Sequence, residues 1–356
     1  MLVENKFLFN FAASYSTGGY KRLYEYARWF NRNGGAWFVI HPRCADLIAE
    51  FPNSKFFVAK QSRVERLYND CGYLNAIAKE IGRPELYYSY GIPLYFRFGK
   101  INWFHLSNVL PLGTKAIPLS VFERVKAGYL GRKIVRGFAN ADVISAESDC
   151  SLGMLGLDPS ERLFLSVNGS DDELACLRSK RTANSQNIAT VVGTAAYKAL
   201  EDSFLVFEML KKTSNGLKLA IIGNPGWIPR ALKGKQDVVI RGLLQRSDVI
   251  DCLRSTKFYI STTCIENSYN AAAEGVFFAD ESYISDIGPH RELLVTMPFE
   301  EVSVPGVRTP LLHVRRDSLT GANLKSWETV IVQMIARFQE AIRSCSPSTP
   351  AMEWRR

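Results

Sequence analysis

Short apolar segments alternate with amphipathic helical patterns along nearly the whole chain, and this alternation limits the folds open to it. Segments typical of buried parallel strands occur in the first half at 6–12, 36–40, 86–90, 102–106, 142–146 and 163–167. Between them, apolar side chains recur at helical spacing around residues 20–30 and 62–81. Because parallel strands need crossover connections, the pattern predicts a doubly wound α/β domain.

The same alternation starts again after residue 186. Further strands are expected at 188–192, 217–222, 238–241, 258–262 and 283–285, and helices near 200–213, 247–255, 269–279 and 323–343. We therefore predict two doubly wound, parallel-sheet α/β domains, over 1–170 and 187–325, joined by a polar linker at 171–186. Two such domains would face each other across a cleft at the carboxyl ends of their strands, a common place for ligands.

Composition excludes several classes of protein. The net charge of +9 favours anionic partners such as nucleic acid, membranes or phosphorylated ligands, and most of the excess lies in residues 1–168. No apolar stretch is long enough to span a bilayer, and the N-terminus does not have the pattern of a secretory signal. The seven cysteines form no C-x-x-C pair, which argues against a zinc ribbon or disulfide scaffold and favours a reducing cytoplasm.

Two carboxylates flank an expected helix start after the strand at 258–262. Glu266 would lie in the loop and Glu274 two turns into the helix, with the segment 268–270 between them. The first turn of a helix offers unpaired N–H groups and the positive end of a dipole, so it suits an anion. This arrangement fits a nucleotide sugar, with one carboxylate at the ribose hydroxyls and the other at the sugar. The spacing alone also fits two surface glutamates.

Two more loops could contact phosphate. Lys198 follows the strand at 188–192 and the glycine Gly193, and a lysine there can reach a phosphate as a point charge. Gly18 and Gly19 form a turn between the first strand and the first helix, which lets backbone approach a ligand. The turn matches neither G-x-G-x-x-G nor a P-loop. Each feature alone also fits a solvated lysine and an ordinary helix start.

These residues, in this order, resemble the retaining GT-B glycosyltransferases of family 4, which transfer a sugar from a nucleotide sugar. The blocks that carry the resemblance extend over most of the chain, and each is short and loose. They are Gly18-Gly19, His105 after a strand, 141–148, 168–171, 191–193 with Lys198, 221–223, 239–242, Glu266 with Glu274, and 285–292.

The resemblance implies a GT-B fold, a C-terminal helix at about 326–356 that crosses back to the N-terminal domain, and roles for single residues. It implies that Glu274 binds the ribose, that Glu266 and the backbone after it face the donor sugar, and that Lys198 contacts the pyrophosphate. Gly18 and Gly19 would cover the phosphate, and His105 would lie near the transferred sugar. Glu266, His105 and Lys198 are thus the expected catalytic residues.

The sequence departs from the family pattern at two places. Thr194 stands where the family has an arginine, so Lys198 would meet the leaving-group charge alone or with a cation such as Arg241. Where many members have Gly-Phe-Gly after the first glutamate, this chain has Asn267, Ser268 and Tyr269, which suggests a particular donor, with Asn270 as a further contact.

The resemblance further implies the substrates and the setting. It suggests a UDP-linked hexose or N-acetylhexosamine as donor and a lipid-linked (polyprenyl pyrophosphate) glycan as acceptor. The setting would be bacterial surface polysaccharide or O-antigen assembly, at the inner face of the plasma membrane, with retention giving an α-linkage. No Asp-x-Asp occurs in the chain, so no metal or other cofactor is expected.

A basic segment in the N-terminal domain could contact that membrane. Residues 119–138 have a helical pattern that Gly128 and Gly131 are expected to interrupt. After this break, Arg132, Lys133 and Arg136 lie opposite an apolar row made of Leu130, Ile134 and Phe138. Such a helix can lie on an anionic membrane. An ordinary helix that packs its apolar side on the sheet would show the same pattern.

Three other functions remain open at this point. A nucleotide-sugar epimerase has a related two-domain architecture. A non-catalytic binder of sugar nucleotides or glycans is favoured if Thr194 marks a lost phosphate site. A nucleic-acid binder would explain the charge, but the chain has no helix-turn-helix, RRM or KH signature, and nucleic acid is not an expected partner.

Overall fold

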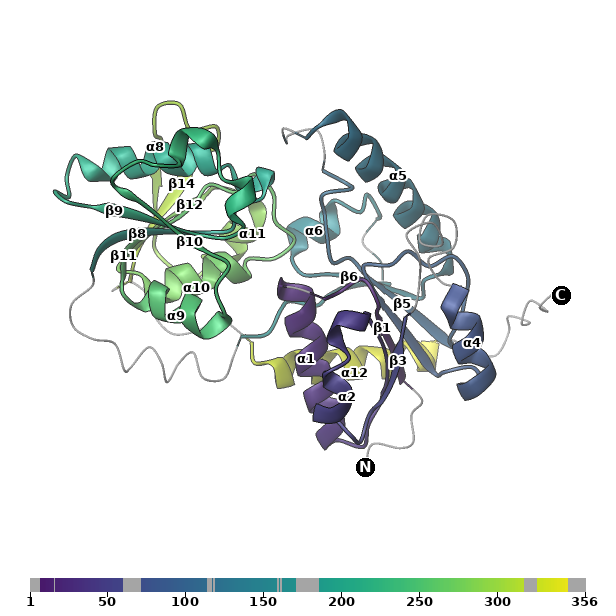
Figure 1. Cartoon of the computed structure of the whole chain (residues 1–356). Coiled ribbons are helices and arrows are strands. Elements are labelled where there is room, and N and C mark those ends of the chain that lie inside the picture. Colours follow the sequence, from purple (N-terminus) through teal and green to yellow (C-terminus); the bar gives the residue numbers. More distant parts are fainter. Residues whose placement is uncertain are drawn as a thin grey trace.

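Two α/β domains make up the protein, as a computed structural model shows (Figure 1). The structure describes residues 7–15, 17–59, 72–113, 117, 119–158, 160, 162–170, 186–316 and 325–344. Each domain has a central sheet of seven strands, so the predicted two-domain α/β architecture is confirmed. The predicted linker lies outside the described residues except for Gln186, which begins the first strand of the second domain.

The sheet of the N-terminal domain is entirely parallel, in the order β3-β2-β1-β4-β5-β6-β7. The strands are β1 (Phe7–Phe11), β2 (Trp37–Ile40), β3 (Lys55–Val58), β4 (Leu86–Tyr90), β5 (Ile101–His105), β6 (Val143–Ala146) and β7 (Leu163–Leu165). The sequence predicted all of them except β3, a four-residue edge strand that begins with an exposed lysine.

Helices cover both faces of this sheet because successive strand side chains point to opposite faces. Phe7, Phe9 and Phe11 of β1 pack against α1 (Thr17–Arg32), whereas Leu8 packs on the other face with α4 (Gly72–Ile81) and α5 (Val121–Gly137). The shorter helices are α2 (Leu47–Glu50) and α6 (Asp149–Gly153), with 3-10 turns at Pro42–Cys44 and Phe138–Asn140. Residues 62–71 of the helix predicted at 62–81 lie outside the described residues.

The sheet of the C-terminal domain is mixed, in the order β10-β9-β8-β11-β12-β14-β13. Its parallel strands are β8 (Gln186–Val192), β9 (Lys218–Ile222), β10 (Val238–Gly242), β11 (Thr256–Ser261) and β12 (Glu281–Ser285). These five are the strands that the sequence predicted. Two strands that it did not predict make the sheet mixed, because β14 (Leu311–Arg315) pairs antiparallel with β12 and β13 (Glu300–Val302) pairs antiparallel with β14. Both strands lie at the end of the sheet, where a return of the chain needs no crossover helix.

Helices again cover both faces of this second sheet. α8 (Leu200–Lys211) packs on one face, while α9 (Arg246–Arg254), α10 (Asn270–Phe278) and α11 (Gly288–Leu293) pack on the other. The 3-10 turns are at Ala196–Lys198, Pro225–Trp227 and Arg230–Leu232.

The C-terminal helix α12 (Trp327–Ser344) returns to the N-terminal domain, as predicted, and lies beside α1 (Figure 1). Its buried apolar side completes the core on the α1 face of the first sheet through Trp327, Ile331, Met334, Ile335, Phe338 and Ala341. Ser170, after β7, and Ser326, just before α12, form an isolated parallel bridge. Residues 345–356 of the predicted C-terminal segment lie outside the described residues.

The predicted interruption of the helix at Gly128 and Gly131 is wrong. α5 runs unbroken from Ser120, whose side chain and Glu123 form a capping box, to Gly137. Gly131 is buried, and a Cβ there would lie 2.6 Å from the carbonyl oxygen of Pro111. This glycine therefore permits close packing of α5 on a loop and does not end the helix.

Candidate functional site

Lys198 and Glu266, two predicted catalytic residues, form an ion pair between the loop after β8 and the loop after β11. The lysine ends a 3-10 turn, and Ala199 after it has a left-handed backbone (φ 48°) that redirects the chain into α8. Burial, the largest single cause, disfavours the charged ammonium of Lys198, but the charge of Glu266, its hydrogen bond and two nearby tyrosines together outweigh burial and raise the lysine pKa. The pair therefore presents a fixed cation and a fixed carboxylate at the carboxyl edge of the sheet.

Glu274 lies in α10 and pairs with Arg246, whose Nη2 is 2.7 Å from Glu274 Oε1. Arg246 is the first residue of α9, after β10, and the sequence reasoning missed it. Arg246 lies next to Glu274 because α9 packs beside α10, and no local pattern in the sequence could have shown this contact. The N-terminus of α10 has no side-chain cap, which fits the expected anion site, although the helix begins at Asn270.

Lys198, Glu266 and Glu274 all lie near the side chain of Tyr259. This buried tyrosine of β11 has its pKa raised to about 12, chiefly by burial, and the charges of Lys198, Glu266 and Glu274 all act on it. His290 of α11 also lies near Lys198. Burial, the largest cause, together with the lysine charge lowers the pKa of His290 to about 4, so its ring is neutral at pH 7. The sequence reasoning quoted His290 in a motif without giving it a role.

Asn267 and Ser268, which are predicted to contact the donor, connect the two domains. Asn267 Nδ2 donates to the carbonyl oxygen of Leu106 at 2.9 Å, and Ser151 Oγ donates to the carbonyl oxygen of Asn267 at 3.0 Å. Asn168 Nδ2 donates to Ser268 Oγ at 3.1 Å. The loop after Glu266 is therefore held against the carboxyl edge of the N-terminal sheet.

Glu292 makes a second connection between the domains. Its carboxylate accepts from the backbone N–H groups of Asp149 at 2.9 Å and Cys150 at 2.8 Å, in the first turn of α6. Tyr269 lies nearby, since burial and the charges of Glu292 and Asp149 raise its pKa. A carboxylate from one domain thus caps a helix of the other.

His105, the third predicted catalytic residue, is fully buried at the end of β5, beside the Leu106 that Asn267 contacts. Its Nδ1 is 2.8 Å from Ser145 Oγ and its Nε2 is 3.4 Å from Glu147 Oε1. Because a carboxylate only accepts, the neutral ring carries its proton on Nε2 and accepts the Ser145 hydroxyl at Nδ1. Burial and the Arg22 charge lower the pKa of His105 to about 4.

Arg22, from α1, neutralises the carboxylate beside His105. Its Nη2 is 3.8 Å from Glu147 Oε1, and Tyr90 donates to the same oxygen at 2.9 Å. Burial alone would raise the pKa of Glu147, but the hydrogen bond from His105 and the Arg22 charge outweigh it and lower that pKa. Glu147 was part of a quoted sequence block, and its role as the anion of this buried group was not foreseen.

Thr194 lies in the loop after β8, as expected, whereas the two glycines lie within a helix. Gly18 and Gly19 form the first turn of α1 and not a separate turn before it. A Cβ on Gly19 would lie 3.0 Å from Ser14 Oγ, so this glycine permits a close approach. Thr194 is buried and donates through Oγ1 to the carbonyl oxygen of Asn224 at 3.1 Å, which fixes the loop after β8 to the loop after β9.

The remaining predicted residues are more scattered. Arg241 is exposed in the edge strand β10, and within the described residues no hydrogen bond or ion pair joins it to Lys198 or Glu266. Arg132, Lys133 and Arg136 lie on α5, where the ammonium of Lys133 is 5.0 Å from the ring centroid of Tyr95 and 4.8 Å from that of Tyr129.

The described ranges contain neither a metal-ligand cluster nor a membrane-spanning helix. No group of three or more His, Cys, Asp or Glu side chains there could hold a metal ion. None of the helices in those ranges is both long and apolar enough to cross a bilayer.

Solved structures share this architecture over nearly the whole chain. HepE from Anabaena, crystallised with UDP and glucose, is 13% identical with a TM-score of 0.61 and covers 94% of this chain and 99% of its own. WaaG, a glycosyltransferase involved in lipopolysaccharide biosynthesis, is 10% identical with a TM-score of 0.59, at 96% and 95% coverage. A candidate UDP-N-acetylglucosamine 2-epimerase from Listeria monocytogenes is 10% identical with a TM-score of 0.56, at 98% and 100% coverage.

These likenesses show the fold alone, and the fold is GT-B. No family model matches the sequence, and no curated protein sequence matches it significantly.

Proposed function

We propose that the protein is a metal-independent, retaining glycosyltransferase that takes its sugar from a nucleotide sugar. The observation that carries the proposal is the convergence of Lys198, Glu266 and Glu274 around Tyr259 at the carboxyl edge of the second sheet. The GT-B fold supports it, since the HepE structure of that fold holds UDP and glucose.

Each residue has a role that its chemistry supports. Glu274 accepts the ribose hydroxyls, and Lys198 provides positive charge for the leaving diphosphate, on which negative charge grows as the glycosidic bond breaks. Glu266 orients the sugar hydroxyls and holds Lys198 in place. Asn267 Oδ1 is buried without a hydrogen-bond partner among the described residues, so it is an acceptor that a donor hydroxyl would satisfy.

His105 would act as a neutral polar side chain at the end of β5, and not as a charged group. Its ring is neutral and buried, so we assign it the polar support of the cleft wall beside the donor sugar. The proposed reaction proceeds by same-face attack, with the leaving phosphate taking the acceptor proton, and gives an α-linkage. The donor would be a UDP-linked hexose or N-acetylhexosamine.

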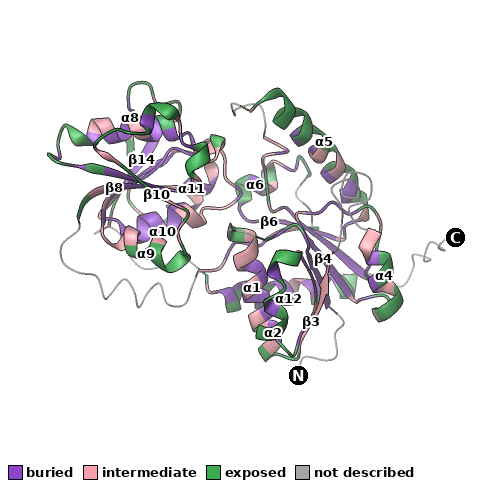
Figure 2. Cartoon of the chain, in the orientation of Figure 1, coloured by how far each residue is buried: buried purple, intermediate pink, exposed green. Residues whose placement is uncertain are grey.

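The acceptor is proposed to be a polyprenyl-pyrophosphate-linked glycan at the inner membrane surface, in surface polysaccharide assembly. Support comes from α5, although not from the apolar row first considered, because Leu130, Ile134 and Phe138 pack into the N-terminal core. Instead, the helix exposes apolar side chains near its start, at Val121 (82% exposed), Phe122 (77%), Val125 (67%) and Tyr129 (48%) (Figure 2).

Basic side chains accompany this exposed apolar row along α5: Arg124, Lys126, Arg132, Lys133 and Arg136, against the single carboxylate Glu123. Each cation near an anionic surface contributes about 1 kcal/mol. We therefore propose that α5 lies on anionic lipid. Phe122→Ser with Val125→Ser should abolish sedimentation with phosphatidylglycerol vesicles, while Val332→Ser, at a 49% exposed apolar site on α12, should not. Unchanged sedimentation of the double variant would disprove the membrane role.

The catalytic proposal is tested by nucleotide binding and turnover. UDP should raise the melting temperature more than GDP, ADP or CDP, and Glu274→Gln should remove most of this stabilisation. Lys198→Gln should lower turnover of the matching UDP-sugar about 100- to 1,000-fold, the typical loss for one transition-state donor. Lys211→Gln is the control, because Lys211 pairs with Asp237 on the surface. Full turnover by Lys198→Gln would refute the assigned role.

The likeness to a candidate epimerase favours one alternative, epimerisation of the UDP-sugar. Product analysis separates the two functions, because a transferase gives UDP and a glycoside whereas an epimerase returns a UDP-sugar. Nucleotide binding without either product would indicate a non-catalytic binder.

A further inference from the structure

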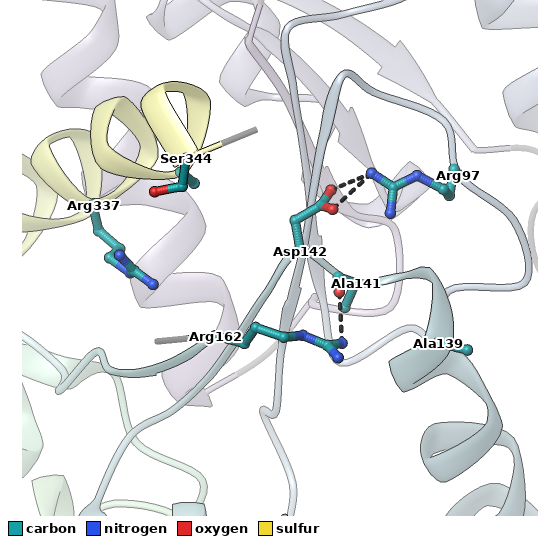
Figure 3. A pocket seen from close by; sticks show the side chains of 8 residues that line it. Arg97, Ala139, Ala141, Asp142, Arg162, Arg337 and Ser344 are labelled. Carbon is teal, nitrogen blue, oxygen red and sulfur yellow. Dashed lines mark hydrogen bonds and ion pairs between the residues drawn. The ribbon is translucent and has the colours of Figure 1, made fainter. Parts of the chain in front are cut away.

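A second site lies between α12 and the N-terminal sheet, where a cavity of about 380 Å³ opens to the surface (Figure 3). Its charged lining is mostly basic, with three arginines and one aspartate. Small side chains make room for it. The lining residues are Arg97, Ala139, Ala141, Asp142, Arg162, Arg337, Ala341 and Ser344.

This cavity is separate from the proposed donor site. Asp142 directly precedes β6 and Arg162 directly precedes β7, so both lie at the amino edge of the first sheet. Leu106 and Glu147, which face the second domain or the His105 group, follow the carboxyl ends of strands. A four-residue strand such as β6 spans about 13 Å, so the two ends of the sheet hold two distinct environments.

Arg162 gives the cavity a fixed cation. Its Nη2 donates to the carbonyl oxygens of Phe138 at 2.6 Å and Ala141 at 2.7 Å, which immobilises the guanidinium at the cavity wall. Within the described residues, no carboxylate lies within 4.0 Å of it. A guanidinium held by carbonyl groups keeps its full charge and loses little side-chain entropy when it binds an anion.

The two other arginines differ in how firmly they are paired. Arg97 Nη2 lies 2.7 Å and 2.6 Å from the two carboxylate oxygens of Asp142, which also accepts from the backbone N–H of Asn102. Among the described residues, the one ion pair of Arg337 is with Glu340, at 3.0 Å, and Glu340 is 58% exposed. Water screens such an exposed pair, so Arg337 can exchange Glu340 for a ligand at small cost.

We propose that this cavity binds a phosphate group, held by Arg162 and Arg337 with Arg97 at the edge. Guanidinium groups match phosphate oxygens with paired donors, which makes phosphate the ligand best suited to this arrangement. The walls formed by Ala139, Ala141 and Ala341 leave space for the group that carries the phosphate. The inference does not depend on the proposed glycosyltransferase activity.

Titration calorimetry with inorganic phosphate, at constant ionic strength, tests the site. Arg337→Gln should weaken phosphate binding about tenfold, because a hydrogen bond to a charged group is lost. Glu340→Gln is the matched variant on the same helix, and it should tighten binding severalfold by removing the competing carboxylate. Lys198→Gln should leave this binding event unchanged. Equal affinities for wild type, Arg337→Gln and Glu340→Gln would overturn the proposal, as would loss of binding in Lys198→Gln alone.

The source of the phosphate is identified by two further probes, glycerol 3-phosphate and phosphatidylcholine vesicles with phosphatidic acid. If Arg337→Gln weakens the binding of vesicles, the site takes a lipid headgroup. If it weakens only glycerol 3-phosphate, the site takes a soluble phosphate ester. If it weakens neither, the proposal is wrong.

Discussion

Arg22 offers the sharpest test of how buried charge holds the N-terminal domain together. The side chain is 0% exposed and donates to the carbonyl oxygens of Ser166 at 2.9 Å and Val167 at 3.0 Å, and to Asn168 Oδ1 at 3.1 Å. Arg22→Met has a similar volume but no donors. It would leave these oxygens, and the carboxylate of Glu147, without their cation.

The expected cost follows from these contacts. Breaking one partner of a buried ionic group destabilises a protein by about 3–5 kcal/mol, because the remaining charge is left uncompensated. For a domain of this size that corresponds to a fall in melting temperature of about 10 °C. Arg28→Met is the control on the same helix, since Arg28 is 39% exposed and lies 3.4 Å from Glu25. It should cost less than about 0.5 kcal/mol.

Thermal unfolding and hydrogen exchange measure this effect. Exchange should accelerate in β1 and β6 of the Arg22→Met variant while β8 and β9 remain protected. Adding Glu147→Gln should restore about 1–2 kcal/mol, because the pair is then removed as a whole. The reasoning fails if Arg22→Met costs under 1 kcal/mol, or if the two substitutions are simply additive.

Three further outcomes are expected. Glu292→Ala should give a more open arrangement of the domains in small-angle X-ray scattering, because two backbone N–H groups of the first domain lose their acceptor. Glu301→Ala, at a site 62% exposed, is the control and should leave the scattering unchanged. The pKa of His290 is about 4 in the folded chain and about 6.5 in the unfolded chain. The free energy of unfolding should therefore be highest above pH 6.5 and fall by up to about 3 kcal/mol as the pH drops toward 4. His290→Gln should flatten this part of a pH–stability curve. Gly275→Ala should destabilise the protein by about 1–3 kcal/mol in urea unfolding, because its Cβ would lie 2.2 Å from the Tyr259 ring. Gly128→Ala, where a Cβ would meet no atom within 4 Å, should stabilise the protein by up to about 1 kcal/mol.

The repeating strands, and the placement of Lys198 and Glu266 in loops that follow two of them, could be predicted because both depend on short-range pattern. Buried parallel strands are continuous apolar runs, and residues that follow such strands gather at one edge of the sheet. The strands β13 and β14 escaped prediction for the same reason. Glu300–Val302 is short and mostly exposed, and nothing local shows that Leu311–Arg315 returns antiparallel.

The roles of Asn267 and Glu292 could not be predicted from the sequence. Asn267 was expected at the donor sugar and Glu292 belonged to a block of the resemblance, yet their observed partners are Leu106, Asp149 and Cys150, which belong to the other domain. Contacts between domains depend on the relative placement of two folded bodies, and no periodicity records that placement. The same holds for α5, whose pattern showed cations and an apolar side but not which apolar residues the sheet would cover.

The return of α12 to the first domain sets an order for folding during synthesis. Phe7 and Phe338 are in edge-to-face contact in one core, although nearly the whole chain separates them. The ribosome therefore completes the second domain, whose strands all lie within residues 186–315, before the first has its last core helix. Until α12 emerges, the face of the first sheet that it covers is exposed at Trp103 and its neighbours, and a chaperone that binds aromatic surface would engage the nascent chain there.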